Sequence, residues 1–313
     1  MSNQRQLPLF QQRPSSSEEI TRATPFNATW ELFAEHLSVE GKSDHTVVAF
    51  TSDLDLFGQF HGKGVAIGDI KTEDLDGFMH WLEYGRDVPC SRKSYARRVT
   101  TLKVYFKWLH DLGALKSDPA KAILQRSGPA PLSDVLTPAQ TEACLHASRT
   151  FTFRRGYIPD TRPEMLLRLL LETGIKKNEA MALTPANLIT DDPQALMIEV
   201  RFKVRNVFKE RKIPVARDWL PLYEVYMSQY APSQVIFDCT ARNLEYVLAH
   251  IGEKVALPFK LSFEICRWTS ALNDLRSGMG EDTIRQKLGL SDISWYETGQ
   301  KLRELRKRLE EGR

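Results

Sequence analysis

The stretch Leu170-Leu-Glu-Thr-Gly-Ile-Lys-Lys-Asn-Glu-Ala-Met-Ala-Leu183 decides how the second half of this chain is organised. Apolar residues at positions 166, 167 and 170 share one helical face, which predicts a helix that ends near Thr173. Gly174 marks a tight turn after that helix. A second helix is predicted directly beyond the turn, with Ala180, Met181 and Leu183 facing inward. The stretch therefore predicts two helices joined at Gly174.

The length of 313 residues predicts about two domains, and a hydrophobic content of 42% suffices for a core in each. No run approaches the roughly 20 apolar residues of a membrane span, and the first residues lack the apolar segment of a signal peptide. The four cysteines, Cys90, Cys144, Cys239 and Cys266, match no zinc or disulfide spacing. We therefore expect reduced, buried thiols, a cytoplasmic protein, and no metal, membrane or small-molecule partner.

The distribution of charge is more informative than its net value of +3. Residues 27–89 carry 4 Lys/Arg against 12 Asp/Glu, whereas residues 90–126 carry 9 against 2. A basic helix taken alone is often just a solvated face. Such one-sided segregation within one domain favours a surface that faces nucleic-acid phosphates.

The first domain is predicted as a four-helix bundle over residues 26–126, after a disordered arm at 1–25. Helices are expected at 27–38, capped by Asn27, after the cap Ser43, after Thr72, and from about 91 to 112. The last helix should bury Tyr95, Val99, Leu102, Phe106 and Leu109. Its other face carries the basic residues Arg92, Lys93, Arg97, Arg98 and Lys103.

A linker at 127–136 leads to a second domain at 137–313 that is predicted to be mostly helical with a small antiparallel sheet. Two strands, 195–202 and 211–215, should flank a basic hairpin tip at 204–208. Between positions 201 and 217 the hairpin holds seven basic residues against one acid, Glu210. Further helices are expected at about 218–229, 240–254, 260–276, 280–288 and 297–311.

Several segments, in their order, resemble the tyrosine recombinases, the phage integrase and Xer family. Thr173-Gly-Ile-Lys-Lys-Asn-Glu179 is similar to the family's Thr-Gly-Leu-Arg-x-x-Glu, and Lys209-Glu-Arg-Lys-Ile-Pro-Val215 resembles its hairpin segment. In the first domain, the segments that begin at Ser43 and Ala96 and the Asp118-Pro119-Ala120 end are similar to its core-binding domain. The resemblance covers about residues 27–300. It implies a core-binding (SAM-like) domain followed by a catalytic-type domain.

The resemblance also implies a chemistry, in which a tyrosine hydroxyl attacks a DNA phosphodiester. Two arginines bind the phosphate oxygens, a hairpin lysine protonates the leaving oxygen, and histidines assist. In this chain the first arginine position is Lys176 and the second is Arg267. The hairpin lysine position falls on Asn206, with Lys203 as the nearest upstream substitute. Lysine supplies a charge but no planar fork, so this exchange is not conservative.

The remaining positions of that chemistry depart further from the family pattern. The two histidine positions hold Glu264 and Leu290, and the nucleophile position holds Gly299. Tyr296 lies about one helical turn before Gly299 and is the alternative nucleophile, although simple packing is the more ordinary interpretation. Only Arg267 keeps its family identity among the six roles, and Arg267 itself has a structural alternative.

These residues predict a duplex-DNA-binding relative of the recombinases that is catalytically degenerate, acts in a regulatory, architectural or partner role, and needs no cofactor. The expected DNA contacts are Arg92, Lys93, Arg97, Arg98, Lys103, Arg205, Lys209, Arg211 and Arg267. One alternative is an active enzyme in which Tyr296 attacks beside Lys176, Arg267 and Lys203. Another is a protein–protein module without DNA affinity. The amphipathic segment with Leu302, Leu305 and Leu309 packs on its own domain or pairs with a second copy or an active recombinase. Chromosomal DNA as partner would make the protein nucleoid-associated.

Overall fold

The computed structural model describes residues 14–88, 90–124, 132–153, 158–192, 195–204 and 207–311. The side chains of 191, 192, 195, 202–204, 207 and 208 are outside that description. The chain divides into two compact units between Ala130 and Pro131. Residues 205 and 206 of the predicted hairpin tip and residues 127–131, half of the predicted linker, lie outside the description.

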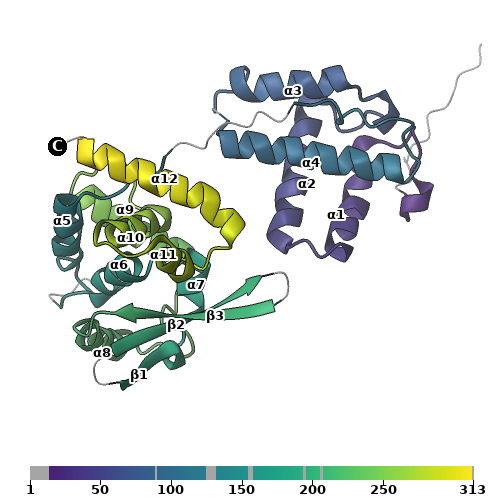
Figure 1. Ribbon diagram of the computed structural model, residues 1–313. Coiled ribbons are helices and arrows are strands. Elements are labelled where there is room, and N and C mark those ends of the chain that lie inside the picture. The colour runs from purple at the N-terminus through teal and green to yellow at the C-terminus, as the bar shows by residue number, and fades with distance from the viewer. Residues whose placement is uncertain are drawn as a thin grey trace, which may run out of the picture. The chain divides into compact units, whose positions relative to one another are not determined.

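The first unit is a bundle of four helices preceded by short 3-10 turns (Figure 1). The helices are α1 (Trp30–Val39), α2 (Asp44–His61), α3 (Thr72–Tyr84) and α4 (Arg92–Asp111). Ser43 caps α2 as predicted, because its side-chain oxygen accepts a hydrogen bond from the Thr46 amide. Asn27 does not cap α1, since it lies inside a 3-10 turn, Phe26–Thr29, that leads into the helix.

The core of the first unit is aromatic and is built largely on α4. All five residues predicted to face inward on α4 are buried. Tyr105, also fully buried, meets Phe26 and Phe33 edge to face at ring distances of 5.4 and 5.1 Å. Its hydroxyl lies 2.5 Å from the hydroxyl of Thr29, so the polar end of the ring is satisfied inside the core. The opposite face of α4 is thereby fixed toward the surface.

The expectation of a disordered arm does not hold for residues 14–25. Ile20 is buried in the bundle core, and Pro25 pairs with Ala66 in an antiparallel bridge. The Arg22 guanidinium donates to the Gly68 carbonyl oxygen at 3.0 and 3.2 Å. A single apolar residue and these long-range backbone contacts order the segment, and neither leaves a periodic sequence signal. Residues 1–13 lie outside the described part of the chain.

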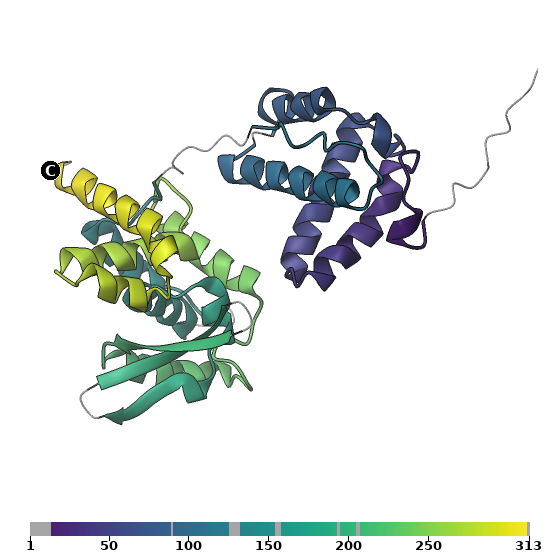
Figure 2. The same cartoon turned by 45° about the vertical axis from the view of Figure 1, so that its right-hand side comes forward.

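The second unit is mostly helical with one small sheet (Figures 1 and 2). Its first part contains α5 (Pro138–Ser148), α6 (Thr161–Thr173), α7 (Lys177–Ala182), β1 (Leu188–Asp192), β2 (Ala195–Val204) and β3 (Val207–Val215). Its second part contains α8 (Trp219–Tyr230), α9 (Ala241–Lys254), α10 (Phe263–Arg276), α11 (Glu281–Lys287) and α12 (Asp292–Glu311). The mainly helical fold with a small antiparallel sheet is the predicted one.

The sheet has three antiparallel strands in the order β1-β2-β3, one more than predicted. In the long hairpin Ile198 pairs with Ile213 and Glu199 with Lys212, so the apolar side faces the core and the charged side faces solvent. The additional strand β1 is Leu-Ile-Thr-Asp-Asp, and its register with β2 is interrupted between Ile189 and Asp192. So short and polar a segment lacks the alternation that identifies a strand from sequence.

The C-terminal helix α12 begins at Asp292, five residues before the predicted start, and continues without interruption to Glu311. Leu302 and Leu305 are buried in a small core with Leu272, Leu275 and Ile284, from α10 and α11. The apolar stripe of α12 therefore packs on its own unit in this structure.

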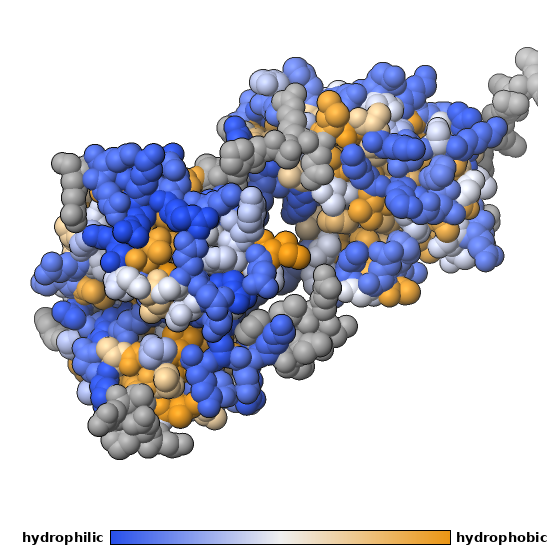
Figure 3. Space-filling model, in the orientation of Figure 1, coloured by the Kyte–Doolittle hydropathy of each residue, from blue (hydrophilic) through white to orange (hydrophobic). Residues whose placement is uncertain are grey.

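No described helix is both long and apolar enough to cross a bilayer. On the face that Figure 3 shows, hydrophilic side chains dominate, and the hydrophobic surface is broken into separate patches.

Candidate active site

The Gly174 turn brings Lys176 to the start of α7. Gly174 ends α6 in the left-handed conformation, with φ at +61°, which a glycine adopts at little cost. A Cβ at this position would lie 3.0 Å from a Leu288 methyl group and 3.2 Å from the Ser270 hydroxyl, so the turn also leaves little room for a side chain. Lys176 follows two residues later, with an exposed side chain, as the residue that caps α7.

Arg211 of β3 is joined to Glu179 of α7 by a two-pronged ion pair. Its Nη1 and Nη2 donate to the two carboxylate oxygens of Glu179 at 3.0 and 2.8 Å, and its Nε donates to the Lys287 carbonyl oxygen at 2.7 Å. The two side chains are only 9% and 5% exposed. Arg211 was predicted as a DNA contact, but this geometry commits its guanidinium to the protein interior.

Arg267 of α10 is held by two backbone carbonyls. Its Nη1 donates to Gly174 O and its Nη2 donates to Leu288 O, the latter at 2.7 Å. Arg211 and Arg267 therefore bind the consecutive carbonyls of residues 287 and 288 at the end of α11. Each arginine also reaches the 174–179 turn. Three elements distant in sequence are thus tied together around Lys176.

The cluster concentrates positive charge. Lys176, Arg211 and Arg267 lie near one carboxylate, that of Glu179. The charges of Arg267 and Arg211 both lower the pKa of Lys176, and the charge of Arg211 also lowers the pKa of Arg267. Burial lowers the pKa of Arg267 to about 10, while Glu179 opposes that change. Loss of solvation also lowers the pKa of Lys176, helped by Arg267 and Arg211 and opposed by Glu179. The pKa of Glu179 would rise on burial, but the hydrogen bonds and charge of Arg211 lower it overall. The cluster therefore holds three cationic side chains against one carboxylate.

The nucleophile position is occupied by backbone under an indole ring. Gly299 is buried in the middle of α12, and a Cβ there would lie 3.1 to 3.4 Å from atoms of the Trp295 ring. Tyr296 stands on the same helix with 72% of its surface exposed. Cys266, next to Arg267, is fully buried, and burial raises the pKa of its thiol, which makes it a poor nucleophile. Glu264 is exposed at the start of α10.

Some basic side chains of α4 are exposed to solvent, whereas others pair with the buried carboxylate of Asp53. Arg92 and Lys93 are exposed in the first turn of α4, and Lys103 is partly exposed about three turns further along the helix. Arg97 donates to the buried carboxylate of Asp53 at 2.8 Å, with 43% of its side chain still exposed.

Arg98, in contrast, is directed into the protein. Its side chain is only 13% exposed, its Nε lies 3.4 Å from Asp53 Oδ1, and its Nη1 donates to the Cys90 sulfur at 2.7 Å. Thr101 donates to the other Asp53 oxygen at 3.0 Å. Burial raises the pKa of Asp53, against the opposing influence of Arg97, Thr101 and Arg98. Asp53 therefore orients the middle of α4, a role that sequence reasoning missed.

The hairpin residues are only partly described. Lys209 is exposed on β3. Arg205, and the side chain of Lys203, lie outside the description. A second basic group that the sequence did not reveal lines a hollow of about 460 Å³ beside α7 and α9. Its cations are Lys177, Arg242 and Lys260. One acid, Glu245, faces them and pairs with Lys177 at 2.7 Å.

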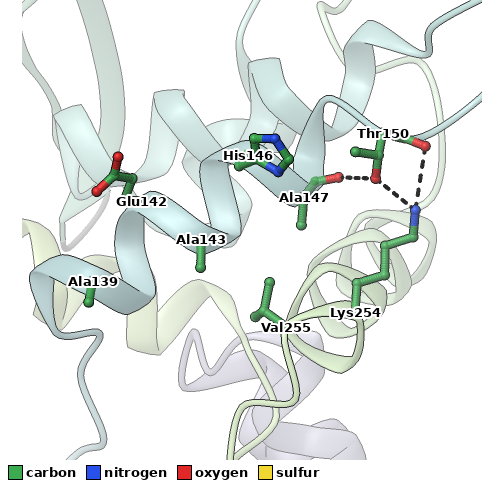
Figure 4. A pocket seen from close by; sticks show the side chains of 8 residues that line it. All are labelled: Ala139, Glu142, Ala143, His146, Ala147, Thr150, Lys254 and Val255. Atoms are coloured by element: carbon green, nitrogen blue, oxygen red, sulfur yellow. Dashed lines mark hydrogen bonds between the residues drawn. The ribbon is translucent and has the colours of Figure 1, made fainter.

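A larger hollow, of about 620 Å³, lies between α5 and the end of α9 (Figure 4). Ala139, Ala143 and Ala147 line one side, while the Lys254 ammonium donates to the Thr150 hydroxyl at 2.9 Å. It contains none of the predicted site residues. Among the described residues, no group of three or more histidine, cysteine or acidic side chains is placed to bind a metal ion.

Comparison with known proteins fits this arrangement. The family model of the phage integrase N-terminal SAM-like domain matches residues 30–113, which span the four helices of the first unit. The tyrosine recombinase XerC of Roseiflexus castenholzii is 30% identical over 283 residues, covering 86% of this chain and 87% of the relative. The chain belongs to the tyrosine recombinase family. XerD of Rhizobium meliloti is 26% identical over 295 residues, covering 84% of this chain and 87% of that protein.

Solved structures of this family share the fold. The XerH recombinase bound to palindromic difH substrate superposes with a TM-score of 0.71 at 14% identity, over 91% of this chain and 83% of the other. A λ integrase dimer bound to a COC′ core site superposes with a TM-score of 0.69 at 12% identity, over 88% of this chain and 77% of the other. The predicted fold, a SAM-like domain followed by a recombinase catalytic-type domain, is confirmed.

Proposed function

We propose that this tyrosine recombinase relative binds duplex DNA and does not cleave it by the family's usual route. The observation that carries this proposal is Gly299, buried beneath Trp295 within an unbroken α12. Glycine has no side-chain nucleophile, and a tyrosine built there would have to displace the indole ring. Without a hydroxyl at this position the covalent phosphotyrosyl step has no attacking group.

Binding is supported by the surfaces that remain charged. Arg92, Lys93 and Lys103 reach solvent from α4. In the second unit, Lys176 and Arg267 offer an ammonium and a guanidinium with unused N–H groups, since a guanidinium has five and the two carbonyls take only two. Cations held in place by the fold are suited to phosphate oxygens. The XerH and λ integrase structures described above contain DNA, which is consistent with this partner.

Each group has a defined place in this proposal. The α4 cations bind phosphates along a groove, and Lys176 with Arg267 binds one phosphate in the second unit. Lys209 and the neighbouring hairpin residues Arg205 and Lys203 add contacts in our proposal. A DNA-bound protein without strand transfer acts by occupying a site or by pairing with an active recombinase. α12 is our candidate for such pairing, because its charged face is exposed while its leucines are buried.

The test is to incubate the purified protein with pooled genomic fragments at moderate salt. Bound DNA is recovered and sequenced, and the same sample is run on a denaturing gel beside a catalytically active family member. We expect enrichment of DNA without any band that survives denaturation. Failure to bind any duplex at low salt would refute the DNA-binding half of the proposal and favour a protein–protein module.

A second candidate function rests on Tyr296, whose exposed side chain is accessible to a bound strand. In that case Tyr296 attacks the phosphate while Lys176, Arg267 and Lys203 surround it. A covalent protein–DNA band that disappears in the Tyr296→Phe variant would establish this function and overturn our proposal. Tyr246→Phe is a suitable control, because Tyr246 is also an exposed tyrosine of the second unit.

A further inference from the structure

The carboxylate of Glu179 could compete with a DNA phosphate for the ammonium of Lys176. The two residues lie three positions apart at the start of α7, and the Glu179 carboxylate already accepts a hydrogen bond from the Lys176 backbone amide at 2.8 Å. A buried carboxylate in this place would normally pair with the nearest ammonium. A lysine paired in that way has lost much of its attraction for a phosphate.

The structure shows a different partner for this carboxylate. Both Glu179 oxygens are taken by the guanidinium of Arg211, at 2.8 and 3.0 Å. The third nitrogen of the Arg211 guanidinium, Nε, donates to the Lys287 carbonyl oxygen, so the guanidinium cannot turn away from Glu179 without losing that bond. Among the described contacts of Lys176, no ion pair within 4 Å joins its ammonium to Glu179 or to another acid.

We propose that Arg211 is a positioning residue that keeps Lys176 available for a DNA phosphate by occupying Glu179. Arg211 itself makes no DNA contact in this arrangement, in contrast to its sequence-based prediction. The inference rests on the proposed DNA binding, since it assigns Lys176 its ligand. It explains why a buried arginine of the hairpin is directed at the acid beside Lys176 rather than toward solvent.

The electrostatics of the cluster agree with this role. Burial lowers the pKa of Lys176, and the charges of Arg267 and Arg211 lower it further, while Glu179 acts in the opposite sense. Removing Arg211 removes one lowering influence and leaves Glu179 without its partner. The pKa of Lys176 should therefore rise in such a variant. Replacing Glu179 by glutamine in the intact protein should lower the pKa further.

The central experiment compares DNA binding by Arg211→Met with binding by the double variant Arg211→Met/Glu179→Gln. In the single variant Glu179 captures Lys176, and affinity should fall about tenfold, the typical effect of losing one charge-assisted hydrogen bond. In the double variant the acid is gone, so most of that affinity should return. Arg211→Met/Glu210→Gln is the matched control, because it removes an exposed acid of the same hairpin instead. It should not restore binding.

Wild-type affinity in Arg211→Met would overturn the proposal, as would equal recovery in both double variants. A folded single variant whose loss is not recovered in Arg211→Met/Glu179→Gln would assign Arg211 a purely structural role. If Arg211→Met does not fold, Arg211→Lys serves in its place. A lysine keeps the charge but cannot bind both Glu179 oxygens and the Lys287 carbonyl together.

A second measurement needs no DNA. Reductive methylation with ¹³C-formaldehyde makes the ammonium of Lys176 visible by NMR, and its pKa is read from a titration, with Lys176→Arg used to assign the signal. The pKa should rise in Arg211→Met, which removes the charge of residue 211, and fall in Glu179→Gln. An unchanged pKa would overturn the proposal. If the wild type binds no DNA while these shifts appear, the proposed function fails and the effect of Arg211 on Lys176 stands.

Discussion

Replacing Gly289 by alanine should destabilise the second unit far more than a glycine-to-alanine change normally does. Gly289 follows α11 with φ at +62°, in the left-handed region. A Cβ there would lie 2.8 Å from Nη1 of Arg211. The end of an arginine side chain usually moves aside at little cost. Arg211 cannot, because Lys287 and Glu179 hold all three of its nitrogens.

The magnitude follows from two separate effects. An alanine in the left-handed conformation costs about 1–2 kcal/mol. Displacing Nη1 weakens a buried hydrogen bond between charged groups, which is valued at about 1.5–3 kcal/mol. The free energy of unfolding should therefore fall by about 2.5–5 kcal/mol in total. For a unit of this size that decrease lowers Tm by roughly 5–20 °C.

Gly278→Ala is the matched control in the same unit. Gly278 has φ at +88°, and a Cβ there would meet nothing within 4 Å, so only the backbone effect of about 1–2 kcal/mol applies. Both variants are measured by urea denaturation and calorimetry of the full chain, resolving the transition of the second unit. In an Arg211→Met background the excess cost of Gly289→Ala should vanish. Equal destabilisation in the two single variants would refute the argument that Arg211 is held rigidly.

Three further changes test other parts of the molecule. Ser43→Ala removes the cap of α2 and should lower the unfolding free energy of the first unit by about 1 kcal/mol in urea denaturation; no change would show that the cap is dispensable. Combined alanine replacement of Arg92, Lys93 and Lys103 should weaken DNA binding. The slope of log affinity against log salt should become less steep by about 0.9 for each phosphate that is no longer neutralised. An unchanged slope would show that these α4 residues do not contact DNA. The pKa of Lys176 is lowered, so as pH rises its ammonium loses its charge at a lower pH than a free lysine does. DNA affinity should therefore decline at a lower alkaline pH for the wild type than for Lys176→Arg, whose guanidinium stays charged. Superimposable pH profiles would contradict the role of Lys176 in binding.

Much of the fold was predictable because its signals are local. The five apolar positions of α4 recur at helical spacing within twenty residues, and all are buried. The turn at Gly174 and the long hairpin were predicted from similarly short patterns. β1, the ordered segment 14–25 and the early start of α12 were not, because none of them has a buried apolar period of its own. The first turn of α12, for example, carries Ile293 and Tyr296 with 88% and 72% of their surfaces exposed, so it does not continue the buried apolar stripe.

The candidate site was predictable as a set of positions but not as an arrangement. The resemblance pointed to Lys176, Arg267 and the vacant position 299, and the structure brings Lys176 and Arg267 into one cluster. The resemblance did not reveal which basic residues pair with acids of the protein itself. Arg98 and Arg211 lie in the same basic segments of the sequence as Arg92 and Lys209. In the structure, however, Arg98 is directed at Asp53 and Arg211 at Glu179.

The sequence by itself determined the helices, the hairpin and the chemical types available at each position, since apolar periodicity, caps and glycine turns act over a few residues. Only the tertiary structure decided which charges are free to meet a ligand. A guanidinium finds its partner through space, 44 residues away for Arg97 and Asp53 and 32 for Arg211 and Glu179. Burial then makes that pairing obligatory, because an unpaired charge in the interior costs far more than one at the surface.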